Sequence, residues 1–126
     1  VTALQPIMAL DTPNPNDTVQ QPFLVAGWAI DQAAASGSGV DAVHVYAYPS
    51  DASGQPTGPY ALGKAASYGL SRPDVGAAFG SQFTNSGYTL DVSGLPAGYY
   101  HLAIFAHSTV SGAWNQAHRV VRLLSS

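Results

Sequence analysis

The amino-acid sequence predicts an all-β fold, an immunoglobulin-like antiparallel β-sandwich of about seven strands with one short helical insert. Three observations point to this class. The segment Leu95-Pro96-Ala97-Gly98-Tyr99-Tyr100 has the form of a tyrosine corner, in which a Tyr near the start of strand F bonds to the backbone upstream. Short alternating apolar stretches are separated by loops rich in Gly, Pro, Asn and Asp. Trp28 stands in an early strand and is expected to be the buried core Trp of such a sandwich.

The strands are predicted from alternating side chains bounded by turn residues. They are expected at 7–10, 23–30, 40–48, 60–65, 86–92, within 95–107 and at 117–124. The segments 11–17, 31–39 and 49–59 between them are polar or small-residue loops. The alternative fold is a jelly roll, which needs eight strands and usually a longer chain.

One stretch departs from the strand pattern and predicts a short helix between the fourth and fifth strands. Ser71 is suited to the N-cap and Pro73 to the first turn, and an acidic residue follows. Val75 and Phe79 then recur at helical spacing, and Gly80 can end the turn.

The composition indicates one domain over residues 1–126, expected to be a module excised from a larger protein. The chain has no Cys, which excludes disulfides and thiolate metal sites. Its four Lys and Arg residues are scattered through a mildly acidic chain, so a nucleic-acid partner is not expected. The sequence contains no apolar run long enough to span a membrane, so membrane insertion is not expected.

Several blocks recur in an order that resembles bacterial immunoglobulin-like modules of secreted and cell-surface proteins. These blocks are Gly27-Trp28-Ala29-Ile30-Asp31, Gly39-Val40-Asp41-Ala42-Val43-His44-Val45, Tyr68-Gly69-Leu70-Ser71-Arg72-Pro73-Asp74-Val75, Ser86-Gly87-Tyr88 and the 95–100 segment. The resemblance implies an extracellular accessory domain, secreted or at the cell surface, beside an enzyme or adhesin. The resemblance assigns no catalytic or binding role to any residue of this chain.

Alternation also predicts which side chains of the C, F and G strands share the outer face of one sheet. If Tyr100 points inward, the outward set comprises Tyr99, His101, Phe105 and His107 on strand F, His44, Tyr46 and Tyr48 on strand C, and His118 on strand G. Exposed aromatic patches of this kind are typical of binding surfaces. The alternative is that the predicted helix or the 49–59 loop folds over this face and buries it.

Trp114 and Asn115 are predicted to lie in the loop before the last strand, where an aromatic ring beside amide groups suits a carbohydrate contact. The equal alternative is a Trp114 that folds back to cap the core. The ligand-binding candidates are therefore Trp114, Asn115, Tyr46, Tyr99, His101 and His44.

Two kinds of metal site are considered. His101 and His107 stand roughly 20 Å apart along one strand, so a zinc site would need His44 or His118 with one of them. Asp11, Asp17 and Asp31 offer oxygen ligands to calcium, although Asx turns explain the same composition. No other cofactor is expected.

No catalytic motif for a nucleophile, a phosphate loop or a zinc protease is present, so the chain is not expected to be an enzyme. The function that the sequence favours is a non-catalytic accessory module that binds polysaccharide through exposed aromatics. A spacer that docks neighbouring domains of the parent chain is the alternative, and a calcium-stabilised adhesin-type module is the third.

Overall fold

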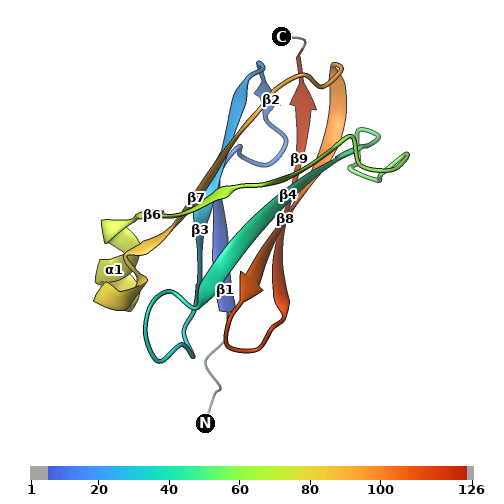
Figure 1. Cartoon of the computed structure of the whole chain (residues 1–126). Helices are drawn as coiled ribbons and strands as arrows, with labels where there is room; N and C mark the ends of the chain where they lie inside the picture. Colours follow the sequence, from blue (N-terminus) through green and yellow to red (C-terminus); the bar gives the residue numbers. More distant parts are fainter. Residues whose placement is uncertain (1–5, 125–126) are drawn as a thin grey trace.

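A computed structural model describes residues 6–124 as two β-sheets packed face to face, with one short helix outside them (Figure 1). The strands are β1 (Pro6–Thr12), β2 (Thr18–Val19), β3 (Phe23–Asp31), β4 (Val40–Pro49), β5 (Leu62–Ala65), β6 (Ser67–Ser71), β7 (Asn85–Val92), β8 (Gly98–Ser108) and β9 (Trp114–Leu123). Helix α1 (Pro73–Phe79) and a 3₁₀ turn (Ser81–Phe83) lie between β6 and β7. The remaining ends of the predicted 1–126 module lie outside the described residues.

The strand order is β1-β3-β7-β6 in one sheet and β2-β9-β8-β4-β5 in the other. All pairs are antiparallel except β2 with β9. The third, eighth and ninth strands thus occupy the places of strands B, F and G of an immunoglobulin sandwich, and β4, β8 and β9 share one sheet as expected. The predicted fold class is confirmed.

The main differences from the predicted strands concern β2, β6 and β9, and β5 begins at Leu62 rather than at residue 60. The sequence pattern does not predict β2 or β6, because a two-residue strand has no readable alternation and β6 is interrupted by Gly69 at φ +96°. The chain changes sheets between β5 and β6, at Ala66. The last strand begins at Trp114, three residues earlier than predicted, so Trp114 is not in a loop.

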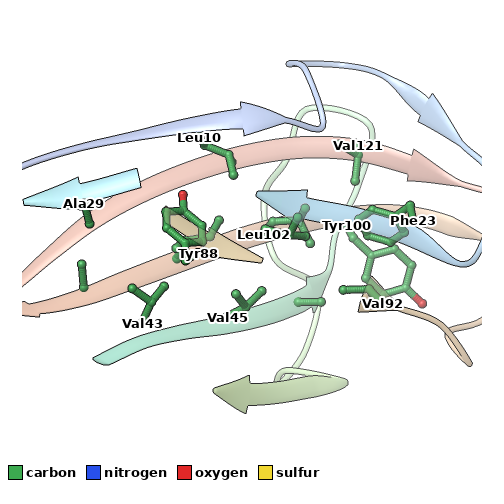
Figure 2. Packing of buried hydrophobic residues seen from close by; sticks show 14 of the residues in the cluster. Leu10, Phe23, Ala29, Val43, Val45, Tyr88, Val92, Tyr100, Leu102 and Val121 are labelled. Atoms are coloured by element: carbon green, nitrogen blue, oxygen red, sulfur yellow. The ribbon is translucent and has the colours of Figure 1, made fainter. Parts of the chain in front are cut away.

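The core fills the space between the inner faces of the two sheets (Figure 2). Tyr100, Leu102, Ile104 and Ala106 of β8 all point into it, which confirms the predicted alternation of that strand. The Tyr100 hydroxyl donates a hydrogen bond to the Pro96 carbonyl at 2.8 Å. The start of β8 is therefore held against the turn that precedes it.

Tyr88, and not Trp28, is the large aromatic residue at the centre of the core. Its side chain is completely buried, and its hydroxyl donates to the Ala9 carbonyl at 2.9 Å. Trp28 lies on the outer face of the four-stranded sheet, so its predicted place in the core is wrong. Both faces of β3 are apolar, and the inner one carries Phe23 and Val25.

Helix α1 covers the end of that outer face around Trp28 and Ile30. Val75 of the helix and Phe83 of the 3₁₀ turn are buried against Ile30, and the Phe79 ring lies 5.5 Å from the Trp28 ring. The helix therefore does not cover the outer face of the other sheet, which the sequence analysis held open as an alternative. No helix within residues 6–124 is long and apolar enough to cross a membrane.

The helix begins one residue later than predicted. Arg72 occupies the N-cap position and Ser71 ends β6. The Arg72 guanidinium makes ion pairs with Asp74 at 2.8 Å and with Asp11 of β1 at 2.7 Å. These contacts raise the pKa of Arg72, with the hydrogen bond to Asp74 as the largest cause. They tie the helix start to the sheet edge in place of a side-chain cap.

Candidate binding site

The outer face of the five-stranded sheet carries the candidate site, and strand register sets its rows. His44 lies opposite Phe105 on β8, and Phe105 lies opposite Gln116 on β9. One row further along, His107 lies opposite Trp114. Because side chains alternate along a strand, all of these point to the same outer face.

Six aromatic or imidazole side chains on this face line an open groove of about 410 Å³. We call it the aromatic groove, and its residues are His44, Tyr46, Tyr48, Tyr60, Phe105 and Trp114. Tyr60 is 54% exposed and Trp114 is 44% exposed. The sequence-predicted residues Trp114, Tyr46 and His44 are thus brought together, with Trp114 exposed and Tyr46 and His44 half-buried.

The rings hold one another in place. Tyr46 is at the centre, with the Phe105 ring at 5.6 Å and the Tyr60 ring at 5.1 Å, both nearly edge-on. At the other end, Trp114 packs between His44 at 5.0 Å and His107 at 4.8 Å. The His107 Nδ1 atom lies 2.7 Å from a carboxylate oxygen of Asp41. Edge-to-face contacts of this kind are favourable, so the groove is largely formed before any ligand arrives.

Gly63 provides the floor beneath the central ring. It pairs with Tyr46 across β4 and β5. A Cβ at this position would lie 2.9 Å from Tyr46 Cε1 and 3.2 Å from Tyr60 Cε2. The absence of a side chain at residue 63 therefore lets both tyrosine rings pack close to the backbone of β5.

Three predicted ligand residues, Tyr99, Asn115 and His101, lie outside the aromatic groove. Tyr99 stands at the opposite end of β8 and lines a separate hollow with Arg122 and Leu124. Asn115 alternates with Trp114 along β9 and so points to the other side of the sheet, where its carboxamide accepts from the Gln116 amide at 3.0 Å. Gln116 is the amide residue on the groove side.

Tyr60 is the groove residue that sequence reasoning missed. It follows the 49–59 loop, and only the path of that loop brings it back beside Tyr46 and Tyr48. Tyr60 follows Pro59 at the start of a predicted strand, and this local sequence does not indicate which aromatic ring Tyr60 contacts. Tyr48 and Phe105 were predicted to face outward, and they do.

The 49–59 loop covers part of the same face, away from the groove. The Gly54 carbonyl lies 3.0 Å from His101 Nδ1, and His101 Nε2 lies 2.9 Å from His118 Nδ1. Gly54 sits close against the sheet at φ +90°, where a Cβ would be 2.3 Å from a Val120 methyl group. Desolvation, and then the charge of His101, lower the pKa of His118. His101 therefore belongs to a histidine pair beside the loop.

The three calcium candidates are separated, and each has protein partners. Asp11 pairs with Arg72, and Asp17 accepts from the Asn14 amide at 3.1 Å. Asp31 is buried, where it accepts from the Ser108 hydroxyl at 2.6 Å. Among residues 6–124, no group of three or more His, Asp or Glu side chains is arranged to hold a metal ion. The geometry gives no support to a calcium site built on these residues.

No protein-family model and no curated protein sequence matches the chain. Its structure is similar to that of an engineered protein, with a TM-score of 0.58, 12% identity, and coverage of 95% of this chain and 20% of that one. The chain thus spans about one fifth of that protein. CopC from Methylosinus trichosporium OB3b is similar over 93% of each chain, with a TM-score of 0.55 and 18% identity.

Fibronectin(III)-like modules of Clostridium thermocellum CbhA also match, with a TM-score of 0.49, 14% identity, and coverage of 93% of this chain and 94% of that one. At such identities, the similarity to the engineered protein and to CopC supports the β-sandwich fold alone.

Proposed function

We propose that this chain is a non-catalytic accessory module that binds carbohydrate in the aromatic groove. The observation that carries the proposal is the set of six rings gathered on a water-facing sheet surface around about 410 Å³ of open space. A sheet surface with no binding role is usually polar. Flat rings with polar edges suit sugars, because a sugar presents an apolar C–H face to the ring and hydroxyls to the rim.

The rim of the groove supplies hydrogen-bonding groups beside the rings. Tyr hydroxyls border one end, and the imidazoles of His44 and His107 border Trp114 at the other. Charged side chains do not line the groove. This chemistry favours a neutral polysaccharide over a strongly charged one.

A polysaccharide pull-down followed by affinity measurement tests the proposal. Trp114→Ala and Tyr46→Ala are each expected to weaken binding about tenfold, as for the loss of one stacking ring. Tyr99→Ala is the matched control, because it removes an exposed tyrosine of the same sheet outside the groove. Binding that survives both groove substitutions, or no binding to any of a broad set of glycans, would reject the proposal.

A spacer that docks neighbouring domains is the second candidate, and one observation favours it. The start of β1 and the end of β9 lie at opposite ends of the sandwich (Figure 1). A chain with this topology enters at one end and leaves at the other, as in a row of modules. The glycan experiment separates the two candidates, because a pure spacer binds no glycan.

We further infer that the module belongs to a secreted or cell-surface bacterial protein. The support is its resemblance, across most of the chain, to immunoglobulin-like modules of such proteins. Detection of the parent protein in the culture medium or by surface labelling of intact cells would test this location.

A further inference from the structure

The histidine pair beside the 49–59 loop has a hydrogen-bond pattern that the proposed glycan site does not use. His101 of β8 and His118 of β9 lie diagonally across the two strands, with ring centroids 5.0 Å apart. Their facing atoms, His101 Nε2 and His118 Nδ1, are 2.9 Å apart. Each ring has a second hydrogen-bond partner on its far side. These partners determine whether the facing nitrogens carry a hydrogen or a lone pair.

The far-side partners are both acceptors. The Gly54 carbonyl lies 3.0 Å from His101 Nδ1, so that nitrogen carries the hydrogen. The Gln116 carboxamide oxygen lies 3.1 Å from His118 Nε2, so that nitrogen also carries a hydrogen. Two neutral rings oriented in this way present a lone pair each at the facing positions. Two lone pairs 2.9 Å apart repel unless a proton or a metal cation lies between them.

The hydrogen bonds of the two histidines to Gly54 and Gln116 also resemble the contacts that metal-binding histidines make with their second ring nitrogen. Such a histidine almost always donates its other N–H to a carbonyl or carboxylate, which fixes the tautomer and the ring orientation. Gly54 itself is held in place, because its amide donates to the Asp51 carbonyl at 3.0 Å. The Asp51 carboxylate accepts from Ser53 and Gln55, and the bond donated by the Ser53 hydroxyl is the largest cause that lowers the Asp51 pKa.

The spacing indicates the class of ion. Two nitrogens bound at ~2.0 Å stand ~2.8 Å apart at a ligand angle of 90° and ~3.3 Å apart at a tetrahedral angle. The observed 2.9 Å matches the right-angle arrangement. Right-angle imidazole ligation is typical of Cu²⁺ and Ni²⁺, and Cu²⁺ binds nitrogen ligands more tightly than Ni²⁺ or Zn²⁺.

We propose that His101 and His118 form a two-histidine site for a divalent transition-metal ion, with Cu²⁺ bound most tightly. Water completes the coordination, since His118 is exposed and the described residues supply no third His, Asp or Glu at the pair. The site is distinct from the aromatic groove, whose lining includes neither histidine.

Calorimetric titration of the whole chain with Cu²⁺, Zn²⁺ and Mg²⁺ tests the proposal. One Cu²⁺ per chain is expected, with Zn²⁺ at least tenfold weaker and no heat from Mg²⁺. His101→Gln and His118→Gln should each weaken Cu²⁺ binding at least tenfold, and Gln116→Leu about tenfold through loss of the outer contact. His107→Gln, which removes a histidine outside the pair, should bind as the wild type does.

A second measurement needs no substitution. The imidazole ¹⁵N resonances of His101 and His118 should shift on addition of Zn²⁺, while those of His44 and His107 stay in place. The proposal is overturned if no saturable binding occurs, if the His101→Gln/His118→Gln double variant still binds one Cu²⁺ like the wild type, or if the shifts appear at His44 and His107 instead. Circular dichroism checks that each variant is folded.

Discussion

Gly27 occupies a point at which three strands come close together. It pairs with Leu10 on β1 and with Tyr88 on β7. A Cβ at this position would lie 2.0 Å from the Ala9 carbonyl oxygen and 2.7 Å from the Tyr88 hydroxyl oxygen. The backbone carbonyl cannot move without breaking the β1–β3 pairing, so any side chain at residue 27 forces the strands apart.

Gly27→Ala is therefore expected to lower the free energy of unfolding by about 3 kcal/mol, the upper range for overpacking a core. Gly58→Ala is the matched control, because a Cβ at residue 58 meets nothing within 4 Å. It should change stability by less than about 0.5 kcal/mol. Urea unfolding measures both, and equal effects of the two substitutions would contradict the packing argument.

Tyr88 links this packing to pH. Burial raises the pKa of its hydroxyl well above the usual 10.0, and the charge of Asp11 adds to the effect. In the unfolded chain the hydroxyl ionises near pH 10, while in the folded chain it stays neutral. The folded state then holds more protons than the unfolded state, so the stability that Tyr88 contributes is complete below pH 10 and is lost as the pH rises above it.

Tyr88→Phe is expected to flatten the fall in unfolding free energy between pH 10 and 12, by up to about 1.4 kcal/mol per pH unit. It should also cost about 1 kcal/mol at pH 7, because the Ala9 carbonyl loses its buried donor. Urea unfolding at a series of pH values measures both effects. An unchanged alkaline slope would show that Tyr88 ionises alike in the two states.

At the scale of elements, α1 packs against the outer face of one sheet and depends on that contact for its stability. It is seven residues long, too short to persist alone. Its stability comes from Val75 and from the contact of Phe79 with Trp28.

Phe79→Ala is expected to expose the Trp28 ring and to destabilise the chain by about 2 kcal/mol, below the range for a fully buried Phe. In a Trp114→Phe background, Trp28 is the only tryptophan of the chain. Its emission maximum should shift to longer wavelength. Ala77→Ser, on the exposed side of the helix, should leave both quantities unchanged. A Trp28 emission that does not respond to Phe79→Ala would mean that the helix does not shield this ring.

The elements also show what the sequence could predict. The β8 alternation was readable because its outer residues include His and Tyr while its inner ones beyond Tyr100 are aliphatic. On β3 both faces are apolar, since one meets the core and the other meets α1. Periodicity cannot tell these faces apart, so Trp28 was assigned to the core. The position of Tyr60 depends on the path of the 49–59 loop, which no local pattern specifies.

At the scale of the whole molecule, the two outer faces of the sandwich differ. Helix α1 packs on one end of the four-stranded sheet (Figure 1), while the five-stranded sheet carries the open aromatic groove. The two tryptophans lie on opposite faces, separated by the core. Facing sheets pack about 10 Å apart, so Trp28 and Trp114 share no contacts, and their substitutions should act independently.

This separation predicts a reciprocal result once a glycan ligand is in hand. Phe79→Ala should lower stability but keep glycan affinity within about twofold of the wild type, since sites without shared partners add independently. Trp114→Ala should weaken binding about tenfold yet change stability by less than about 1 kcal/mol, because the residue is 44% exposed and lies outside the core. Urea unfolding and affinity measured on the same two variants test this. If Phe79→Ala also weakens glycan binding in the folded protein, the covered face contributes to the groove through the core, and the two sheets do not work separately.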